Sequence, residues 1–214
     1  QQFSLTLANG IRLTALLTIP ASCGLWVMSK PIIGLLFQHG NFSAAATTNT
    51  ARALSGLAIG LAGFSVYLFV LRGFYARNDT RTPFFINVGE NVINIVLAIV
   101  LVDRHGVFGL GLSFSIAYLV SALVALLILE STEVDIKLSE LAFNIARIAL
   151  AAGVMTCVVW FTIRQVGSDS GMGALSRVVA GTLIGAATYA VALSALGEKT
   201  MRDYLSSKIT KSSR

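Results

Sequence analysis

The chain has 214 residues, of which 55% are hydrophobic and 12% are charged, and it carries a net charge of +6. A soluble domain has about 25% charged residues, so this composition excludes an ordinary soluble fold and predicts an integral membrane protein, whose apolar exterior is solvated by lipid. The basic residues lie in loops between apolar runs and in the tail, which favours orientation in an anionic membrane over nucleic-acid binding.

Six stretches are long enough to cross about 30 Å of hydrocarbon, which takes roughly 20 helical residues. They are residues 11–28, 54–75, 83–102, 107–129, 141–163 and 178–196. They predict an all-α polytopic bundle over residues 1–197, followed by a basic cytoplasmic tail at 198–214. Pro20 lies in the middle of the first stretch, and we expect it to kink that helix.

The connections between these stretches differ in character. The sequence SKPIIGLLFQHGNFS at 29–43 holds a short apolar run that suits the membrane interface better than a crossing. The sequence RQVGSDSGMGALSR at 164–177 is rich in Gly and Ser and predicts a loop. Glycines four residues apart, Gly56 with Gly60 and Gly181 with Gly185, indicate close helix packing within the bundle, with a dimer interface as the alternative.

A polar cluster separates the second and third stretches in the sequence RGFYARNDTRTP at 72–83. We expect Thr82 to be the N-cap of the third helix, with Pro83 in its first turn. The carboxylate of Asp79 either pairs with a neighbouring arginine or caps the turn. The residues that define this cytoplasmic-loop motif are Arg72, Arg77, Asp79, Arg81 and Pro83.

The distribution of basic residues predicts the orientation of the bundle. Six crossings place both ends of the chain on one side. The other side carries only a few of the 16 basic residues, namely Lys30, Arg52, Arg104, Arg164 and Arg177. The positive-inside rule therefore predicts that both ends and the 77–82 loop lie in the cytoplasm.

The third stretch contains a stripe of polar residues where lipid-facing side chains are expected. Asn87, Glu90, Asn91 and Asn94 follow the spacing i, i+3, i+4, i+7, which places them on one helix face. Glu90 lies seven residues after Pro83, roughly 10 Å along the axis at 1.5 Å per residue, so it is inside the bilayer.

Two interpretations of this stripe stay open. It belongs to an ion or substrate pathway, with Glu90 titrating or coordinating a cation. Alternatively it joins helices, with Glu90 pairing with Arg72 or Arg147 and the asparagines bonding to neighbouring helices. The sequence contains no nucleophile elbow, P-loop, dinucleotide turn or HExxH, so we expect neither an enzyme nor a bound organic cofactor.

Four segments carry a resemblance to a known family: GIRL at 10–13, SKPIIGLLFQHGNFS at 29–43, RGFYARNDTRTP at 72–83 and GLGLSFS at 109–115. Through them residues 10–130 resemble the MurJ (MviN) lipid II flippase family of the MOP transporter superfamily. The resemblance implies the last six helices of a fourteen-helix protein of the bacterial inner membrane, working with an N-terminal lobe that this sequence lacks. It also implies a function, the movement of lipid II from the inner to the outer leaflet by alternating access during cell-wall synthesis.

The resemblance has a further implication for ions. Some family members hold sodium through polar residues four apart in the eleventh helix, and Asn94 matches the first of these positions while Ala98 stands at the second. Our hypothesis is that Glu90 and Asn91 compensate for this change, together with Ser113 or Ser115 from the following helix. The family's essential cavity arginines belong to helices outside this sequence.

Two other functions fit the same features. One is another MOP-type exporter, which moves polysaccharide-linked lipids or exchanges drugs for cations. The other is a membrane scaffold that transports nothing and recruits cytoplasmic partners through its basic tail.

Overall fold

The structure, a computed structural model, describes residues 2–131 and 138–196. The regular elements of these residues are the α-helices α1 Gln2–Val27, α2 Ser29–Phe37, α3 Ala44–Tyr75, α4 Arg81–His105, α5 Val107–Ser131, α6 Leu138–Gln165 and α7 Gly171–Ala195. Six of them, all but α2, are long and apolar enough to cross a membrane. The expected all-α polytopic bundle is confirmed, whereas the tail at 198–214 lies outside the described residues.

Three helices begin well before the hydropathy indicates, namely α1, which starts at Gln2, and the two whose early residues include several polar ones, α3 and α7. Helix α3 starts at Ala44, where the hydroxyl of Ser43 accepts a hydrogen bond from the backbone N–H of Ala46 at 3.2 Å. Helix α7 starts at Gly171, so the loop expected at 164–177 is confined to residues 166–170. Both extensions are polar enough to lie outside hydrocarbon, and apolar content therefore marks the membrane crossing but not the ends of the helix.

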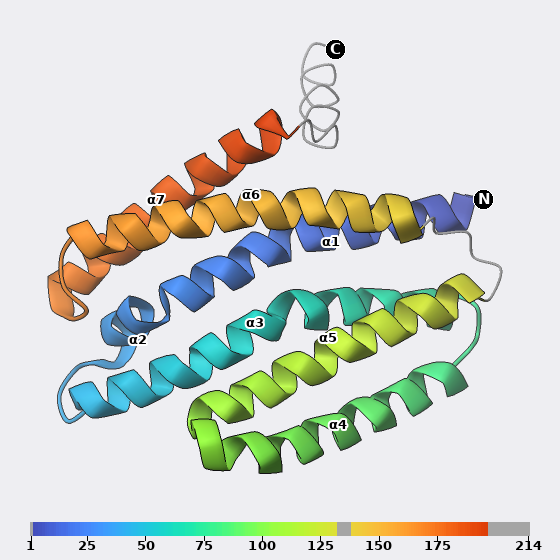
Figure 1. The fold of residues 1–214 in the computed structure, drawn as a ribbon, viewed down its shortest axis with the longest axis horizontal. Helices are drawn as coiled ribbons and strands as arrows, with labels where there is room; N and C mark the ends of the chain where they lie inside the picture. Colours follow the sequence, from blue (N-terminus) through green and yellow to red (C-terminus); the bar gives the residue numbers. More distant parts are fainter. Residues whose placement is uncertain (1, 132–137, 197–214) are drawn as a thin grey trace.

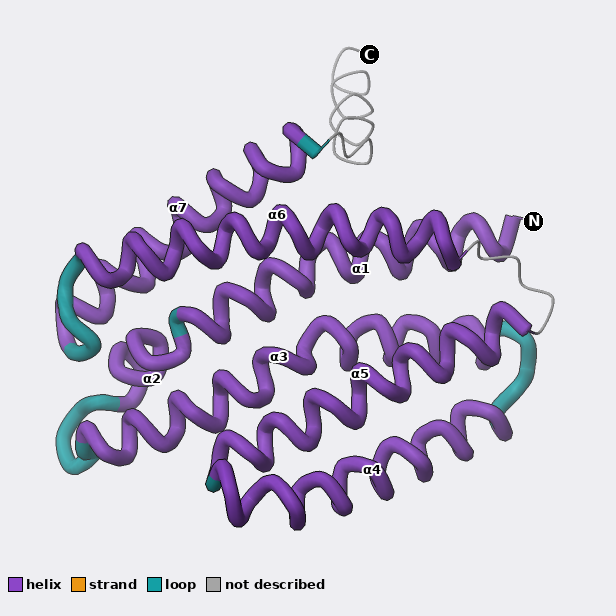
Figure 2. Tube along the Cα trace, in the orientation of Figure 1, coloured by secondary structure: helices purple, strands orange, loops and turns teal. Residues whose placement is uncertain are grey.

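The six long helices lie side by side in the order α4, α5, α3, α1, α6, α7 (Figure 1). Helix α1 is thus in the middle, between α3 and α6. The short helix α2 lies at one end of the bundle, against both α3 and α7. Figure 2 shows that the described connections are short and lie at the two ends of the bundle, as expected for helices that cross a membrane.

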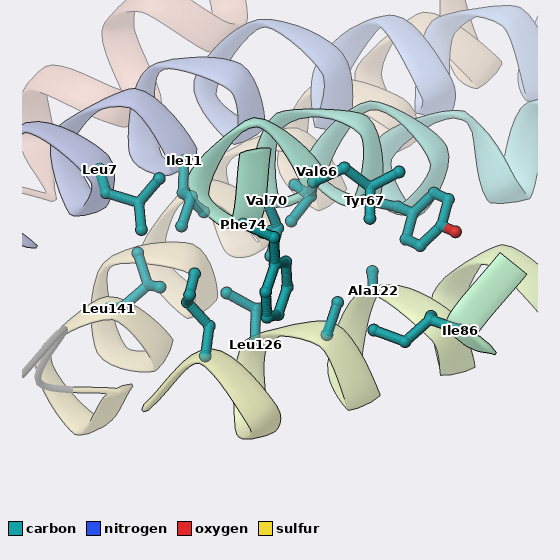
Figure 3. Packing of buried hydrophobic residues seen from close by; sticks show 13 residues of the cluster. Leu7, Ile11, Val66, Tyr67, Val70, Phe74, Ile86, Ala122, Leu126 and Leu141 are labelled. Carbon is teal, nitrogen blue, oxygen red and sulfur yellow. The ribbon is translucent and has the colours of Figure 1, made fainter. Parts of the chain in front are cut away.

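The largest apolar cluster contains residues of α1, α3, α4, α5 and α6 and so connects helices on both sides of α1 (Figure 3). It holds Leu7 and Ile11 of α1, and it continues through Val70 and Phe74 of α3 to Leu129 of α5. Leu141 of α6 and Ile86 of α4 also belong to it. Smaller clusters fill the contacts of α1 with α6 and α7.

Both glycine pairs bring neighbouring helices of this chain together. A Cβ on Gly56 would lie 2.7 Å from the carbonyl oxygen of Phe108, and one on Gly60 would overlap the backbone of Ser115. Gly181 and Gly185 lie against side chains, those of Met28 and Val159. These glycines are buried between helices of one bundle, which confirms the packing role that the spacing predicts.

Helix α1 continues through Pro20 to Val27. Because proline has no backbone N–H, the carbonyl of Leu16 loses its helical partner. The hydroxyl of Tyr189, on α7, donates a hydrogen bond to that carbonyl at 2.8 Å. This contact satisfies a backbone group that would be costly to leave bare in hydrocarbon.

The turn before α4 is capped by Asp79. Its Oδ1 accepts hydrogen bonds from the backbone N–H groups of Arg81 and Thr82, each at 3.0 Å. The expectation that Thr82 is the N-cap is wrong, because the helix begins at Arg81 and Thr82 already lies in its first turn. The other expectation, that Asp79 caps the turn, is confirmed. Asn78 precedes it in the left-handed region, with φ 59°.

Candidate functional site

The first half of the polar stripe forms a cluster on α4. The amide nitrogen of Asn91 donates to the side-chain oxygen of Asn87 at 3.0 Å and to its backbone oxygen at 2.9 Å. The same nitrogen lies 3.0 Å from Oε2 of Glu90. The three residues therefore share one hydrogen-bond network, as the i, i+3, i+4 spacing indicates.

Glu90 is the buried member of this cluster, with 2% of its surface exposed. It lines a pocket of about 270 Å³ between α4 and α5, together with Gly89, Ser121 and Val124. Among the described residues it has no ion-pair partner, so the expected pairing with Arg72 or Arg147 is not observed. Arg147 instead lies over the ring of Phe143, 4.4 Å from its centroid. An acidic side chain buried without a cation is costly and is a mark of function in a membrane span.

Aromatic residues of α3 and α5 surround this acidic group, and the sequence did not single them out. Tyr67 is 1% exposed, and its hydroxyl has no hydrogen-bond partner within the described part of the chain, although Asn87 and Glu90 lie near it. Its ring packs edge-on against that of Tyr118, with centroids 5.5 Å apart. Figure 3 shows the hydroxyl pointing away from Val70 and Phe74. A tyrosine within an apolar run resembles ordinary core, and the polar surroundings appear only when α3 and α4 are placed together.

The second half of the stripe has a different partner. The hydroxyl of Ser113, on α5, lies 3.0 Å from Oδ1 of Asn94 and 2.8 Å from the carbonyl of Leu110. Asn94, Ala98 and Ser113 line a pocket of about 280 Å³ that is otherwise mostly apolar. This pocket is separate from the one beside Glu90, so the structure divides the stripe into two sites.

Ser115 lies in the contact between α3 and α5. Its hydroxyl donates to the carbonyl of Gly56 at 2.6 Å, and it is fully buried. This geometry joins two helices and does not bring Ser115 to Asn94.

The resemblance implies a sodium ion at Asn94, which needs several oxygen ligands. The described residues supply two side-chain oxygens there, those of Asn94 and Ser113, and Ala98 supplies none. Asn91 bonds to Glu90, and Glu90 lines another pocket. Hard cations take about six oxygen ligands, so the set within the described chain is incomplete. Sodium binding at Asn94 stays a prediction that requires ligands from elsewhere.

The cytoplasmic-loop motif fixes the start of the helix that carries the stripe. Asp79 caps α4, and Pro83 is buried in its first turn. Hydrogen bonds from Thr82 lower the pKa of Asp79 below its ordinary value of 3.8, so the cap stays ionised at neutral pH. Arg72, Arg77 and Arg81 are exposed around this turn.

Comparison with known proteins identifies the family. The family described as "Lipid II flippase MurJ" matches residues 1–181. The chain belongs to the MurJ family. A "Probable lipid II flippase MurJ" of Thermotoga maritima is 32% identical over 157 residues, which are 73% of this chain and 32% of that protein. A protein of the same description from Rickettsia prowazekii is 37% identical over 109 residues, which are 51% of this chain and 22% of that protein.

The fold agrees with that of a MurJ protein. A solved structure of the lipid II flippase MurJ in an inward closed conformation matches with a TM-score of 0.77 and 26% identity, covering 95% of this chain and 40% of that chain. Together with the six apolar helices, this establishes a multi-pass membrane protein. The chain spans about a third of the length of the curated MurJ relatives that it matches.

Proposed function

We propose that the chain is the C-terminal part of a lipid II flippase, its last six membrane helices. The observation that carries this proposal is the MurJ match over residues 1–181, supported by the likeness of the bundle to MurJ in an inward closed conformation. In this function the bundle rocks against an N-terminal lobe of the same protein. That motion moves lipid-linked peptidoglycan precursor from the inner to the outer leaflet of the bacterial inner membrane.

The test is complementation of a flippase-depleted bacterium by the full-length parent protein. Restored growth and restored precursor in the outer leaflet are the expected results. Export of a polysaccharide-linked lipid or a drug in place of lipid II would indicate another MOP-type exporter. If the stably inserted protein neither restores lipid II in the outer leaflet nor exports another substrate, it is a scaffold, and the proposal is overturned.

We also propose that the end of the bundle holding the 76–80 loop faces the cytoplasm. Lys30 and Arg177 meet at the other end through Asp169, and Arg52 and Arg104 lie there in one pocket. The basic residues at that other end are a minority of the 16 in the sequence, so the rule that basic residues favour the cytoplasmic side supports this orientation. A cysteine placed at the exposed position His39 should react with an impermeant maleimide added outside the cell, and protection of that cysteine would reverse the orientation.

Within this function we propose that Glu90, with Asn87 and Asn91, takes part in transport and does not only join helices. Its support is a buried carboxyl group with no ion pair among the described residues and a pocket beside it. The amide of Asn91, on the same helix, donates a hydrogen bond to its carboxylate. Rocking of the lobe would change the access of water or a cation to that pocket.

The substitution Glu90→Gln in the full-length protein tests this role, because it keeps the size and hydrogen-bonding ability of the side chain but removes its ionisable group. We expect lipid II transport in proteoliposomes to fall by about tenfold or more, the loss typical of a displaced functional proton or charge, with little change in melting temperature. Asp103→Asn, an exposed substitution on the same helix, is the matched control. Unchanged transport with a lowered melting temperature would leave only the helix-joining interpretation.

A further inference from the structure

A basic pocket of about 530 Å³ lies where α3 begins and α4 ends, and no part of the proposed transport function uses it. Its lining residues are Arg52, Arg104, His105, Gly106 and Phe108. Arg52 comes from α3, Arg104 and His105 from the last turn of α4, and Phe108 from the first turn of α5. Three helices thus bring two guanidinium groups and one imidazole to a single hollow.

The walls of this pocket are held by backbone contacts. Gly106 has a φ of 57°, and it closes the turn between α4 and α5 by donating to the carbonyl of Val102 at 2.8 Å. Gly56, one helical turn after Arg52, packs against the backbone of Phe108 and Gly111. The position of Arg52 relative to the turn therefore depends on helix packing and not on a long loop.

Within the part of the chain that the structure describes, the two arginines have no countercharge. Across residues 2–131 and 138–196, neither Arg52 nor Arg104 has an ion-pair partner. The other basic residues at this end have partners. Lys30 and Arg177 both pair with Asp169, and the guanidinium carbon of Arg164 lies 3.6 Å from the ring centroid of Trp160. Asp103 is exposed but does not line the pocket. Two like charges held in one hollow repel each other, and a bound anion removes that repulsion.

The surroundings of the pocket indicate the kind of anion. Val102 and Val107, on either side of the turn, are exposed, as is Val100 one half-turn further into α4. The pocket therefore lies where the apolar surface of the bundle gives way to polar residues, the depth at which lipid headgroups meet a membrane protein. Guanidinium groups bind phosphate oxygens through paired N–H donors.

We propose that this pocket binds the phosphate group of an anionic membrane lipid. The lipid phosphate accepts hydrogen bonds from Arg52 and Arg104, and its acyl chains extend along the apolar surface beside Val102 and Val107. The lipid ties the start of α3 to the turn between α4 and α5. This binding does not depend on the transport of lipid II.

The experiment measures lipid retention by the full-length parent protein, purified from nanodiscs that contain phosphatidylglycerol and phosphatidylcholine, by native mass spectrometry. We expect the double variant Arg52→Gln/Arg104→Gln to retain phosphatidylglycerol about 30-fold less tightly, since each basic residue near an anionic headgroup contributes about fivefold to the affinity. Phosphatidylcholine should be unaffected. The control Arg164→Gln removes one basic residue from the same end outside the pocket and should leave retention nearly unchanged.

Equal retention of phosphatidylglycerol by the parent and the double variant, with both melting at the same temperature, would overturn the proposal. So would tight binding of inorganic phosphate to lipid-depleted protein, since that result would assign the pocket to a free anion. Retention is measured without turnover. Its outcome is therefore independent of the complementation that tests the flippase.

Discussion

Glu90 and Asn94 are one helical turn apart on α4, yet their surroundings differ. Glu90 bonds within its own helix, to Asn91, whereas Asn94 accepts a hydrogen bond across the helix contact from Ser113. Periodicity predicts that both residues share a face, and it does so correctly. It cannot predict which neighbour each one meets, because that depends on how α4 and α5 are placed against each other.

Asp79 contributes to stability through its ionised form. Because its pKa is lowered in the folded chain, the capping interaction is fully present above the ordinary value of 3.8 and is lost as the pH falls through the folded value. Asp79→Ala should therefore raise amide exchange at Arg81 and Thr82 at pH 7, where their N–H groups lose their acceptor. Hydrogen exchange, expressed as protection factors, measures this change.

The same exchange measurement has an internal control. Asp103→Ala, at the exposed end of α4, should leave the first turn protected. Acidification of the parent protein through the lowered pKa of Asp79 should reproduce the effect of Asp79→Ala. Protection that stays constant in the variant and at low pH would contradict the assignment of Asp79 as the cap.

At the scale of the helices, small residues decide which pairs approach closely. Gly60 lies against Ser115 so tightly that any side chain would meet backbone atoms, while Gly153 on α6 has open space around its Cα. Both glycines stand inside apolar helices. Their difference is invisible in the sequence apart from the spacing of Gly56 and Gly60.

This contrast predicts opposite effects for two identical substitutions. Gly60→Ala should destabilise the bundle by about 1–3 kcal/mol because α3 and α5 must separate. Gly153→Ala should stabilise it by up to about 1 kcal/mol through helix propensity. Thermal unfolding of the full-length protein in one detergent compares the two, and equal shifts of the same sign would show that the contact at Gly60 is not tight.

Hydropathy predicted the six crossings because each one must present an apolar surface to lipid. It missed the early starts of α1, α3 and α7. Polar residues follow within the first two turns of α3 and α7, whose starts are held by Ser43 and by the loop contacts of Arg177. The polar stripe on α4 was also recognisable, since side chains of that kind are rare in lipid. The role of Tyr67 could not be predicted from the sequence, because nothing in a single apolar run shows that Glu90 of another helix lies near its hydroxyl.

Across the whole molecule, one carboxylate links segments that are distant in sequence. Asp169 lies between α6 and α7 and pairs with Lys30 of α2 at 2.9 Å and with Arg177 of α7. Arg177 also donates to the carbonyls of Val166 and Gly167, at 2.7 and 3.0 Å. The short helix α2 is thereby attached to the last helical hairpin.

Asp169→Asn should release α2 from this hairpin while Arg177 keeps its backbone bonds. Because the pair is partly exposed, with 52% of the Lys30 side chain accessible, we expect a loss of about 1 kcal/mol or less. Faster amide exchange at residues 166–170 and in α2 should accompany it. Exchange confined to the loop, with α2 unchanged, would show that apolar packing alone holds α2.

The bond between Tyr189 and Leu16 has a consequence for how the protein is made. Its two residues are 173 positions apart, and the chain is synthesised from its N-terminus. Until α7 leaves the ribosome, the carbonyl of Leu16 must rely on water or a temporary partner within the insertion machinery. A nascent chain halted before α7 therefore holds α1 with one backbone carbonyl unsatisfied, and premature termination there should mark it for quality-control proteolysis.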